Sequence, residues 1–175
     1  MNTILFMGSD YFSLPCLQAL HQSFFTENLV VCSKPKRPKG RGRKLLPTPV
    51  AAYCESNNLV CDEVSEHDKL PEIVSHVKPD LIIVVSFGIF IPKSILETYL
   101  CLNIHPSLLP LYRGPSPIQS ALLNGDLTTG TTLMKLSNKM DAGPIIAQQK
   151  LSVSVKDNYK TLSSKLSELS SSMLV

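Results

Sequence analysis

Asn103, His105 and Asp141 are the residues whose types and spacing best suit chemistry in this sequence. Asn103 and His105 stand two apart after an apolar run, and alternate side chains of a strand project from the same face. A carboxamide donates two N–H groups, and an imidazole can donate, accept or exchange a proton near neutral pH. A carboxylate on a later loop could keep the imidazole charged or relay a proton. The three residues therefore predict a site that stabilises an oxyanion and moves a proton.

The segment HPSLLPLYRGPSPIQ, which follows Ile104, is stiff for a connection. Its four prolines fix φ and remove backbone donors, and Gly114 permits a positive φ. Ser116 and Pro117 predict a helix start, with Gln119 completing a capping box. A histidine on a strand is more often structural, and an Asp before Ala-Gly is usually part of a turn. The stiffness of this loop favours a positioned site instead.

Composition indicates one globular domain. The chain has 175 residues, of which 43% are hydrophobic and 18% charged. No apolar run approaches the roughly 20 residues that cross a bilayer, and no signal peptide is evident, so we expect a cytoplasmic protein without membrane contact. The five cysteines are widely spread and predict buried free thiols. The four histidines show no ligand spacing, so no metal is predicted.

Positive charge is concentrated in one segment. Residues 33–44 contain seven of the 17 basic residues and no acidic one, and the remaining 10 basic and 14 acidic residues give a net charge of −4. Such a run is often a solvated loop, but cations spaced by glycine and proline also suit a phosphate backbone. The prolines and glycines of residues 33–49 predict no regular secondary structure, and the composition predicts disorder in the free protein.

Apolar periodicity predicts alternating strands and helices. Strands are expected at residues 3–7, 29–32, 59–61, 81–85 and 99–105, followed by a strand pair at 131–136 and 145–153. Helices are expected from Ser13, over residues 50–57 and 68–77, from Ser116, and over residues 160–174. This order predicts an α/β, Rossmann-like fold with a mostly parallel central sheet and helices on both faces. Only Gly8 of a G-x-G-x-x-G motif is present, so a dinucleotide site is not expected.

The motifs Asn103-Ile-His105-Pro-Ser-Leu-Leu-Pro110, Tyr112-Arg-Gly114 and Met140-Asp-Ala-Gly143 resemble those of the 10-formyltetrahydrofolate-dependent formyltransferases. Residues 37–50 are similar to the RNA-facing insertion of the members that formylate methionyl-tRNA. The resemblance implies formyl transfer from 10-formyltetrahydrofolate to the amino group of methionyl-tRNA. It also implies that Asn103, His105 and Asp141 are the catalytic residues.

The resemblance also implies two sets of binding residues. The folate would be bound by the loop after residues 81–85, which would line the pterin pocket, and by the loop after His105. These residues are Ser86, Phe87, Gly88, Ile89, Phe90, Ser107, Leu108, Leu109 and Pro110. The tRNA would be bound by the basic segment: Lys34, Lys36, Arg37, Lys39, Arg41, Arg43 and Lys44. Among these, Arg41 lies between two glycines and is the preferred candidate. Phe12, in a partial match to a Gly-Thr-Pro-x-Phe element, is a further pocket candidate.

Several alternatives remain open at this level. Glycinamide ribonucleotide formyltransferases, amino-sugar nucleotide formyltransferases and formyltetrahydrofolate hydrolases use similar motifs, and a non-catalytic RNA-binding module would also keep the basic segment. The apolar stripe of residues 160–174 reaches the last residue without a helix stop signal. We therefore expect residues 1–175 to be a catalytic domain that lacks the C-terminal β-barrel domain of the family. A monomer is expected.

Overall fold

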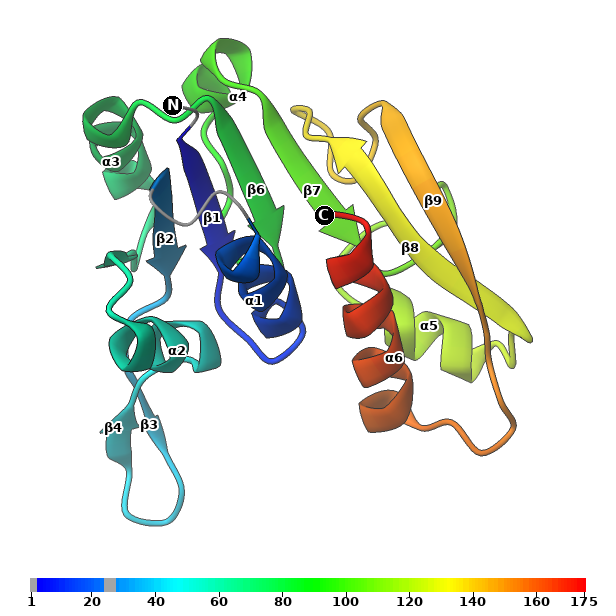
Figure 1. Cartoon of the computed structure of the whole chain (residues 1–175). Helices are drawn as coiled ribbons and strands as arrows, with labels where there is room; N and C mark the ends of the chain where they lie inside the picture. The colour runs from blue at the N-terminus through cyan, green and yellow to red at the C-terminus, as the bar shows by residue number, and fades with distance from the viewer. Residues whose placement is uncertain (1–2, 24–27) are drawn as a thin grey trace.

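A seven-stranded, mostly parallel sheet forms the centre of the computed structural model, which describes residues 3–23 and 28–175 (Figure 1). The strand order is β5-β2-β1-β6-β7-β8-β9. The first five of these strands are parallel: β5 (Cys61–Glu63), β2 (Leu29–Ser33), β1 (Ile4–Gly8), β6 (Leu81–Val85) and β7 (Cys101–His105). β8 (Thr128–Lys135) and β9 (Ile145–Ser152) continue the sheet in antiparallel fashion. The predicted fold class is confirmed.

Two hydrophobic clusters cover the two faces of the sheet. Alternate residues of β1 divide between them, with Phe6 on one face and Leu5 on the other, as the two-residue period of a strand requires. The first face packs against α1 (Leu14–Gln22), α2 (Pro49–Asn57), α5 (Pro117–Leu123) and α6 (Tyr159–Ser172). The second face packs against α3 (Leu70–Val77) and α4 (Lys93–Thr98), as Figure 1 shows. Each parallel strand is therefore buried on both sides, which explains its continuous apolar run.

The order of the parallel strands reverses direction at β1. The chain moves outward through β2 and β5, and then returns to place β6 on the other side of β1. Loops that leave the carboxyl ends of β1 and β6 therefore diverge, and ligands of open α/β sheets bind in the crevice between such loops. This topology fixes where the site must lie.

The basic segment contains regular structure, so the prediction of none is wrong. β3 (Arg37–Lys39) and β4 (Lys44–Leu46) pair as an antiparallel hairpin separate from the main sheet. Gly40 and Arg43 take positive φ values of 72° and 45° in the turn, and Arg43 N–H donates to the Gly40 carbonyl at 3.2 Å. The hairpin buries little apolar surface, so its sequence lacks the alternating pattern that would reveal it.

The structure departs from the sequence-based expectations in three smaller details. The strand expected at residues 59–61 lies at Cys61–Glu63, helix α4 was not predicted, and the Ser116 side chain makes no capping hydrogen bond. Pro117 supplies the pre-set φ at the start of α5, so the helix begins there without the expected capping box. The cysteines are free, and burial raises the pKa of the Cys16 thiol to about 12.

Within residues 3–23 and 28–175, no helix combines the length and the apolar character that a membrane span requires. The same described residues contain no group of three or more His, Cys, Asp or Glu side chains arranged to hold a metal ion.

Candidate active site

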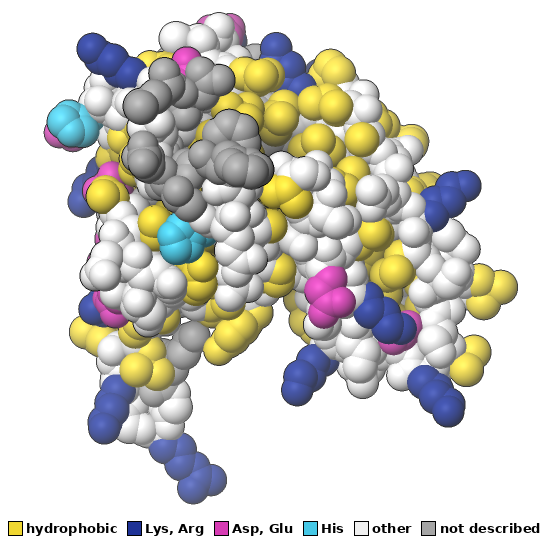
Figure 2. All heavy atoms as spheres, viewed as in Figure 1, with side chains coloured by type: hydrophobic (Ala, Val, Ile, Leu, Met, Phe, Trp, Pro, Cys, Tyr) yellow, Lys and Arg dark blue, Asp and Glu magenta, His cyan; other side chains and the backbone are white. Residues whose placement is uncertain are grey.

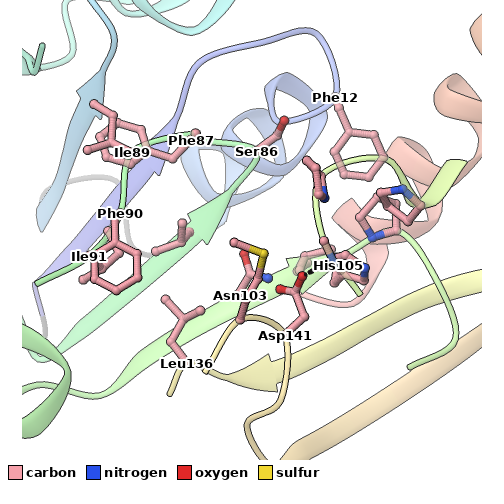
Figure 3. A pocket seen from close by; sticks show the side chains of 18 of the residues that line it. Phe12, Ser86, Phe87, Ile89, Phe90, Ile91, Asn103, His105, Leu136 and Asp141 are labelled. Atoms are coloured by element: carbon pink, nitrogen blue, oxygen red, sulfur yellow. Dashed lines mark hydrogen bonds and ion pairs between the residues drawn. The ribbon is translucent and has the colours of Figure 1, made fainter. Parts of the chain in front are cut away.

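A cavity of about 540 Å³ opens at the carboxyl ends of β1, β6 and β7. It lies where the strand order reverses, as expected for this class of sheet. The β1–α1 turn, the loop after β6, the end of β7 and the loop between β8 and β9 all contribute to its walls. Figure 3 shows the lining residues that matter most below: Phe12, Ser86, Phe87, Ile89, Phe90, Ile91, Asn103, His105, Leu136 and Asp141.

Asn103 and His105 project together into this cavity from β7. The strand is held between β6, which pairs Val84 with Asn103, and β8, which pairs Thr132 with His105. His105 is only 5% exposed. Asn103 lines the cavity, and none of the hydrogen bonds found among the described residues involves its carboxamide. Its N–H donors are therefore available to a ligand.

The His105 ring lies between two hydrogen-bond acceptors. Nε2 is 2.8 Å from the carbonyl oxygen of Tyr112, so this nitrogen carries a proton and donates it. Nδ1 is 3.6 Å from Oδ2 of Asp141, a distance for an ion pair and too long for a hydrogen bond. The ring therefore has an oxygen facing each of its nitrogens. The predicted partnership between His105 and Asp141 is thus present in the geometry (Figure 3).

The stiff loop after His105 positions both partners of the ring. Tyr112 supplies the carbonyl that holds Nε2, and Gly114 N–H donates to Asp141 Oδ2 at 2.8 Å. Gly114 has a φ of 103°, a conformation that only glycine adopts readily. Asp141 lies 27 residues further along the chain, so this one hydrogen bond joins the two loops of the site.

Three residues other than glycine take left-handed backbone conformations around the cavity. The φ angles are 46° at Ser86, 55° at Tyr112 and 46° at Asp141. Such conformations cost roughly 1–3 kcal/mol each and persist where the surrounding structure enforces them, most often at functional sites. At Asp141 and Tyr112 the strained residue is also the one that contacts His105.

Gly143 controls the path of the Asp141 loop. A Cβ at this position would collide with the carbonyl oxygen of Lys135, a residue whose N–H also donates to the Pro144 carbonyl at the base of the loop. We expect Gly143→Ala to displace Asp141 from His105 and to lower catalytic activity at least tenfold, at a cost of about 1–3 kcal/mol in folding stability. Steady-state kinetics together with chemical denaturation would measure both effects. Wild-type activity in this variant would contradict the assigned role of the loop.

The predicted folate residues divide into two groups. Ser86, Phe87, Gly88, Ile89 and Phe90 all line the cavity. Ser107, Leu108, Leu109 and Pro110 are not among the described residues that line it, and their contact with the folate stays a prediction.

The loop of residues 107–110 is instead bound to the antiparallel strands. Ser107 is fully buried, and its hydroxyl donates to the Leu111 carbonyl at 2.6 Å. Thr132 donates to the Ser107 carbonyl at 2.7 Å and accepts from Leu109 N–H at 3.1 Å. Gln148 of β9 donates to the Leu109 carbonyl at 2.9 Å. These contacts fix the loop that carries Tyr112 and Gly114, which is a supporting role.

The predicted tRNA-binding cations do not form one surface. Arg37, Arg41, Arg43 and Lys44 are exposed on the hairpin, which extends from the body as an arm with basic side chains along it (Figure 2). Lys36 pairs with Glu55 of α2 at 3.1 Å. Lys34 lies at the base of the hairpin beside a second cavity. The Lys39 side chain lies outside the described residues.

Sequence reasoning named Phe12, which lines the cavity, but it did not assign Asp10, Gln119 or Tyr159 to the site. Asp10 Oδ2 accepts from the Ser86 hydroxyl at 2.6 Å, which joins the β1–α1 turn to the loop after β6. The signal for Asp10 was available, because it follows a buried strand at the sheet edge where ligands bind. Tyr159, at the start of α6, is distant in sequence and had no such signal.

A comparison with known protein families assigns the chain as a whole. The model of the formyl transferase family matches residues 1–175. The chain belongs to the formyl transferase family. The resemblance read from the Asn103, His105 and Asp141 motifs is thereby confirmed.

The curated relatives that match the chain include methionyl-tRNA formyltransferases. The chain is 42% identical over 177 residues to the methionyl-tRNA formyltransferase of Ehrlichia chaffeensis (strain ATCC CRL-10679 / Arkansas), with 98% of this chain covered. It is 42% identical over 166 residues to that of Hydrogenobaculum sp. (strain Y04AAS1), with 94% covered. The matched regions comprise 58% and 54% of these two relatives, so the chain spans little more than half their length.

Solved structures of other proteins share the fold. Glycinamide ribonucleotide transformylase 1 from Symbiobacterium toebii superposes with a TM-score of 0.81 at 20% identity, covering 99% of this chain and 84% of that one. Phosphoribosylglycinamide formyltransferase from Coxiella burnetii gives a TM-score of 0.76 at 21% identity, covering 98% and 82%. At this identity the likeness concerns the fold alone.

Proposed function

We propose that this protein transfers the formyl group of 10-formyltetrahydrofolate to the amino group of methionyl-tRNA. The observation that carries the proposal is the constellation in the catalytic cavity. There, the free Asn103 carboxamide lies beside a His105 ring that is held between Tyr112 and Asp141. Names of curated relatives that are 40–42% identical over nearly the whole chain support the acceptor.

The residues of the cavity suit each step of this transfer. The neutral amine attacks the formyl carbon, and negative charge develops on the formyl oxygen. Asn103 N–H groups and the His105 cation stabilise that charge, and preorganised donors of this kind are typically worth a factor of about 10²–10³ each. Asp141 orients the ring and relays the proton that the amine loses. The intermediate then collapses as the bond from the formyl carbon to N10 breaks, and that proton ends on N10 of the departing tetrahydrofolate. Holding both substrates in one cavity supplies the remaining advantage of proximity.

The cavity walls also fit the folate. Phe87, Ile89 and Phe90 line the cavity from the loop after β6, with Leu96 and Leu136 elsewhere in the lining. A mostly apolar cavity with a few convergent polar groups is the usual setting for a flat, drug-sized ligand. Ser86 and Gly88, with φ of 46° and 66°, bend this loop so that its backbone lies along the cavity. Backbone groups there can read the polar edge of the pterin.

The basic hairpin distinguishes this acceptor from smaller ones. Within the described structure, no acidic side chain lies within ion-pair distance of Arg41, Arg43 or Lys44. Unpaired cations on an exposed arm suit an RNA backbone, whereas a small acceptor such as glycinamide ribonucleotide would not need them. This favours methionyl-tRNA over the small-molecule formyltransferase and hydrolase alternatives, and the catalytic constellation argues against a purely RNA-binding module.

The proposal also covers the cellular process, the location and the oligomeric state of the enzyme. A protein that formylates methionyl-tRNA takes part in translation initiation, and we place it in the cytoplasm as a monomer that needs no metal. The C-terminal β-barrel domain implied by the family resemblance, which would help to hold the tRNA, remains a prediction.

The direct test is formyl transfer by the whole protein from 10-formyltetrahydrofolate to methionyl-tRNA. Glycinamide ribonucleotide, an amino-sugar nucleotide and water serve as competing acceptors in parallel assays. We expect kcat/KM for methionyl-tRNA to exceed that for each competitor by at least 10²-fold, because only the tRNA can use the hairpin. Turnover of the folate without preference for charged tRNA would overturn the proposal in favour of a small-molecule transferase or a hydrolase.

A further inference from the structure

A second cavity, of about 330 Å³, adjoins the catalytic cavity. Asp10, Ser86 and Gly88 line both cavities, so the two share part of their walls. Lys34, Arg37 and residues 46–49 also line the second cavity. The second cavity therefore lies between the catalytic centre and the base of the basic hairpin.

Lys34 is built into this cavity. Its backbone N–H donates to the Ser9 hydroxyl at 3.1 Å, which ties the residue to the β1–α1 turn. Its Nζ lies directly over Gly88, so closely that a Cβ on that glycine would collide with it. Lys36, two residues on, pairs outward with Glu55 at 3.1 Å. The segment that leads into the hairpin therefore places one of these two lysines in the second cavity and pairs the other with α2.

The charges in the cavity leave one cation in excess. Lys34 and Arg37 are positive, and Asp10 is the one carboxylate among the described lining residues. The Asp10 carboxylate already accepts from the Ser86 hydroxyl at 2.6 Å and from Phe12 N–H at 3.1 Å. Partial burial and the neighbouring Arg37 lower the pKa of the Lys34 amine, while Asp10 acts in the opposite direction. One bound monoanion would neutralise this excess and stabilise charged Lys34.

We propose that Lys34 and Arg37 bind one phosphodiester of the acceptor RNA, the one that joins its 3′-terminal nucleoside to the preceding nucleotide. This inference rests on the proposed function and specifies how the acceptor is held. A phosphodiester carries a single negative charge, which balances the one excess positive charge of the cavity. The terminal nucleoside then extends past Gly88 and Ser86, and the amino acid esterified to it enters the catalytic cavity.

The test compares acceptors that differ by this one group. Lys34→Met in the whole protein is assayed with methionyl-tRNA, with the methionyl ester of the dinucleotide CpA, and with the methionyl ester of adenosine, which has no phosphodiester. We expect kcat/KM to fall about tenfold for the first two and less than twofold for the third, since one charged contact is lost only where a phosphate is present. Lys93→Met, on α4 and outside the lining of both cavities, is the charge-matched control and should change none of the three.

The possible outcomes separate this inference from the proposed function. An equal loss with all three esters would show that Lys34 acts by shaping the Gly88 loop, and no loss with any of them would show that it binds nothing; either result overturns the inference. If the wild type formylates none of the esters, the proposed function is wrong. Binding of uncharged CpA, measured by titration without turnover, still decides the phosphate site: it should weaken about tenfold in Lys34→Met, and unchanged binding would refute the site.

Discussion

We expect Asn103→Ala, His105→Ala and Asp141→Asn each to lower kcat for formyl transfer by about 10²–10³-fold while the protein stays folded. Asn103→Ala removes an N–H donor to the developing oxyanion, and His105→Ala removes the imidazole ring beside it. Asp141→Asn removes the charge that faces His105 Nδ1 at 3.6 Å. The measurements are single-turnover transfer rates and circular dichroism. The double variant His105→Ala/Asp141→Asn should be no slower than His105→Ala, because groups that act as a unit are not additive.

A second His–Asp pair supplies the matched control. His67 Nε2 lies 2.9 Å from Asp68 Oδ1 on the surface, where both side chains are more than half exposed. His67→Ala and Asp68→Asn should leave transfer within about twofold of the wild type, since exposed pairs contribute little. Multiplicative losses in the double variant His105→Ala/Asp141→Asn would refute the coupling between these two residues. Full activity in any single variant at the site would remove that residue from the mechanism.

We expect the triple variant Arg41→Gln/Arg43→Gln/Lys44→Gln to lower kcat/KM for methionyl-tRNA about 10²-fold. These three cations are exposed on the hairpin arm, away from the lining of both cavities. Each contact to a phosphate should contribute about 1 kcal/mol, which lies between the values for exposed ion pairs and for charged hydrogen bonds. The measurement is steady-state kinetics over a range of tRNA and salt concentrations, and the salt dependence of tRNA binding should become shallower by about two to three counterions.

The methionyl ester of adenosine separates recognition from chemistry in this variant. Its formylation should not change, because so small an acceptor cannot reach the arm while it occupies the catalytic cavity. A triple variant that removes three cations elsewhere, Lys69→Gln/Lys93→Gln/Lys156→Gln, controls for net charge. Comparable losses with both acceptors, or with both triple variants, would refute the assignment of the hairpin to tRNA. Arg41→Ala alone then tests whether the cation between the two glycines dominates.

The parallel sheet could be predicted from the sequence because a local run of apolar residues marks each of its buried strands. Leu81–Val85 is apolar throughout, because a strand that is buried on both faces has no solvent-exposed residues. Strand β6 occupies this same range. The hairpin of Arg37–Lys39 and Lys44–Leu46 could not be found in this way. Its strands bury no face, so no periodicity marks them, and the turn depends on the backbone angles of Gly40 and Arg43.

The residue types and the two-residue spacing of Asn103 and His105 were enough to predict, from the sequence alone, a pair of side chains on one face of a strand. The sequence also determined that Asp141 was a candidate partner, but only the tertiary structure brought it to His105. That contact depends on Gly114 N–H and on the Tyr112 carbonyl, whose directions are set by left-handed backbone conformations. Likewise, Ser107 to Pro110 matched a family motif, and only the folded chain showed that these residues support the loop. Side-chain period is a local property that a sequence displays, whereas backbone direction and long-range hydrogen bonds exist only once distant segments are packed together.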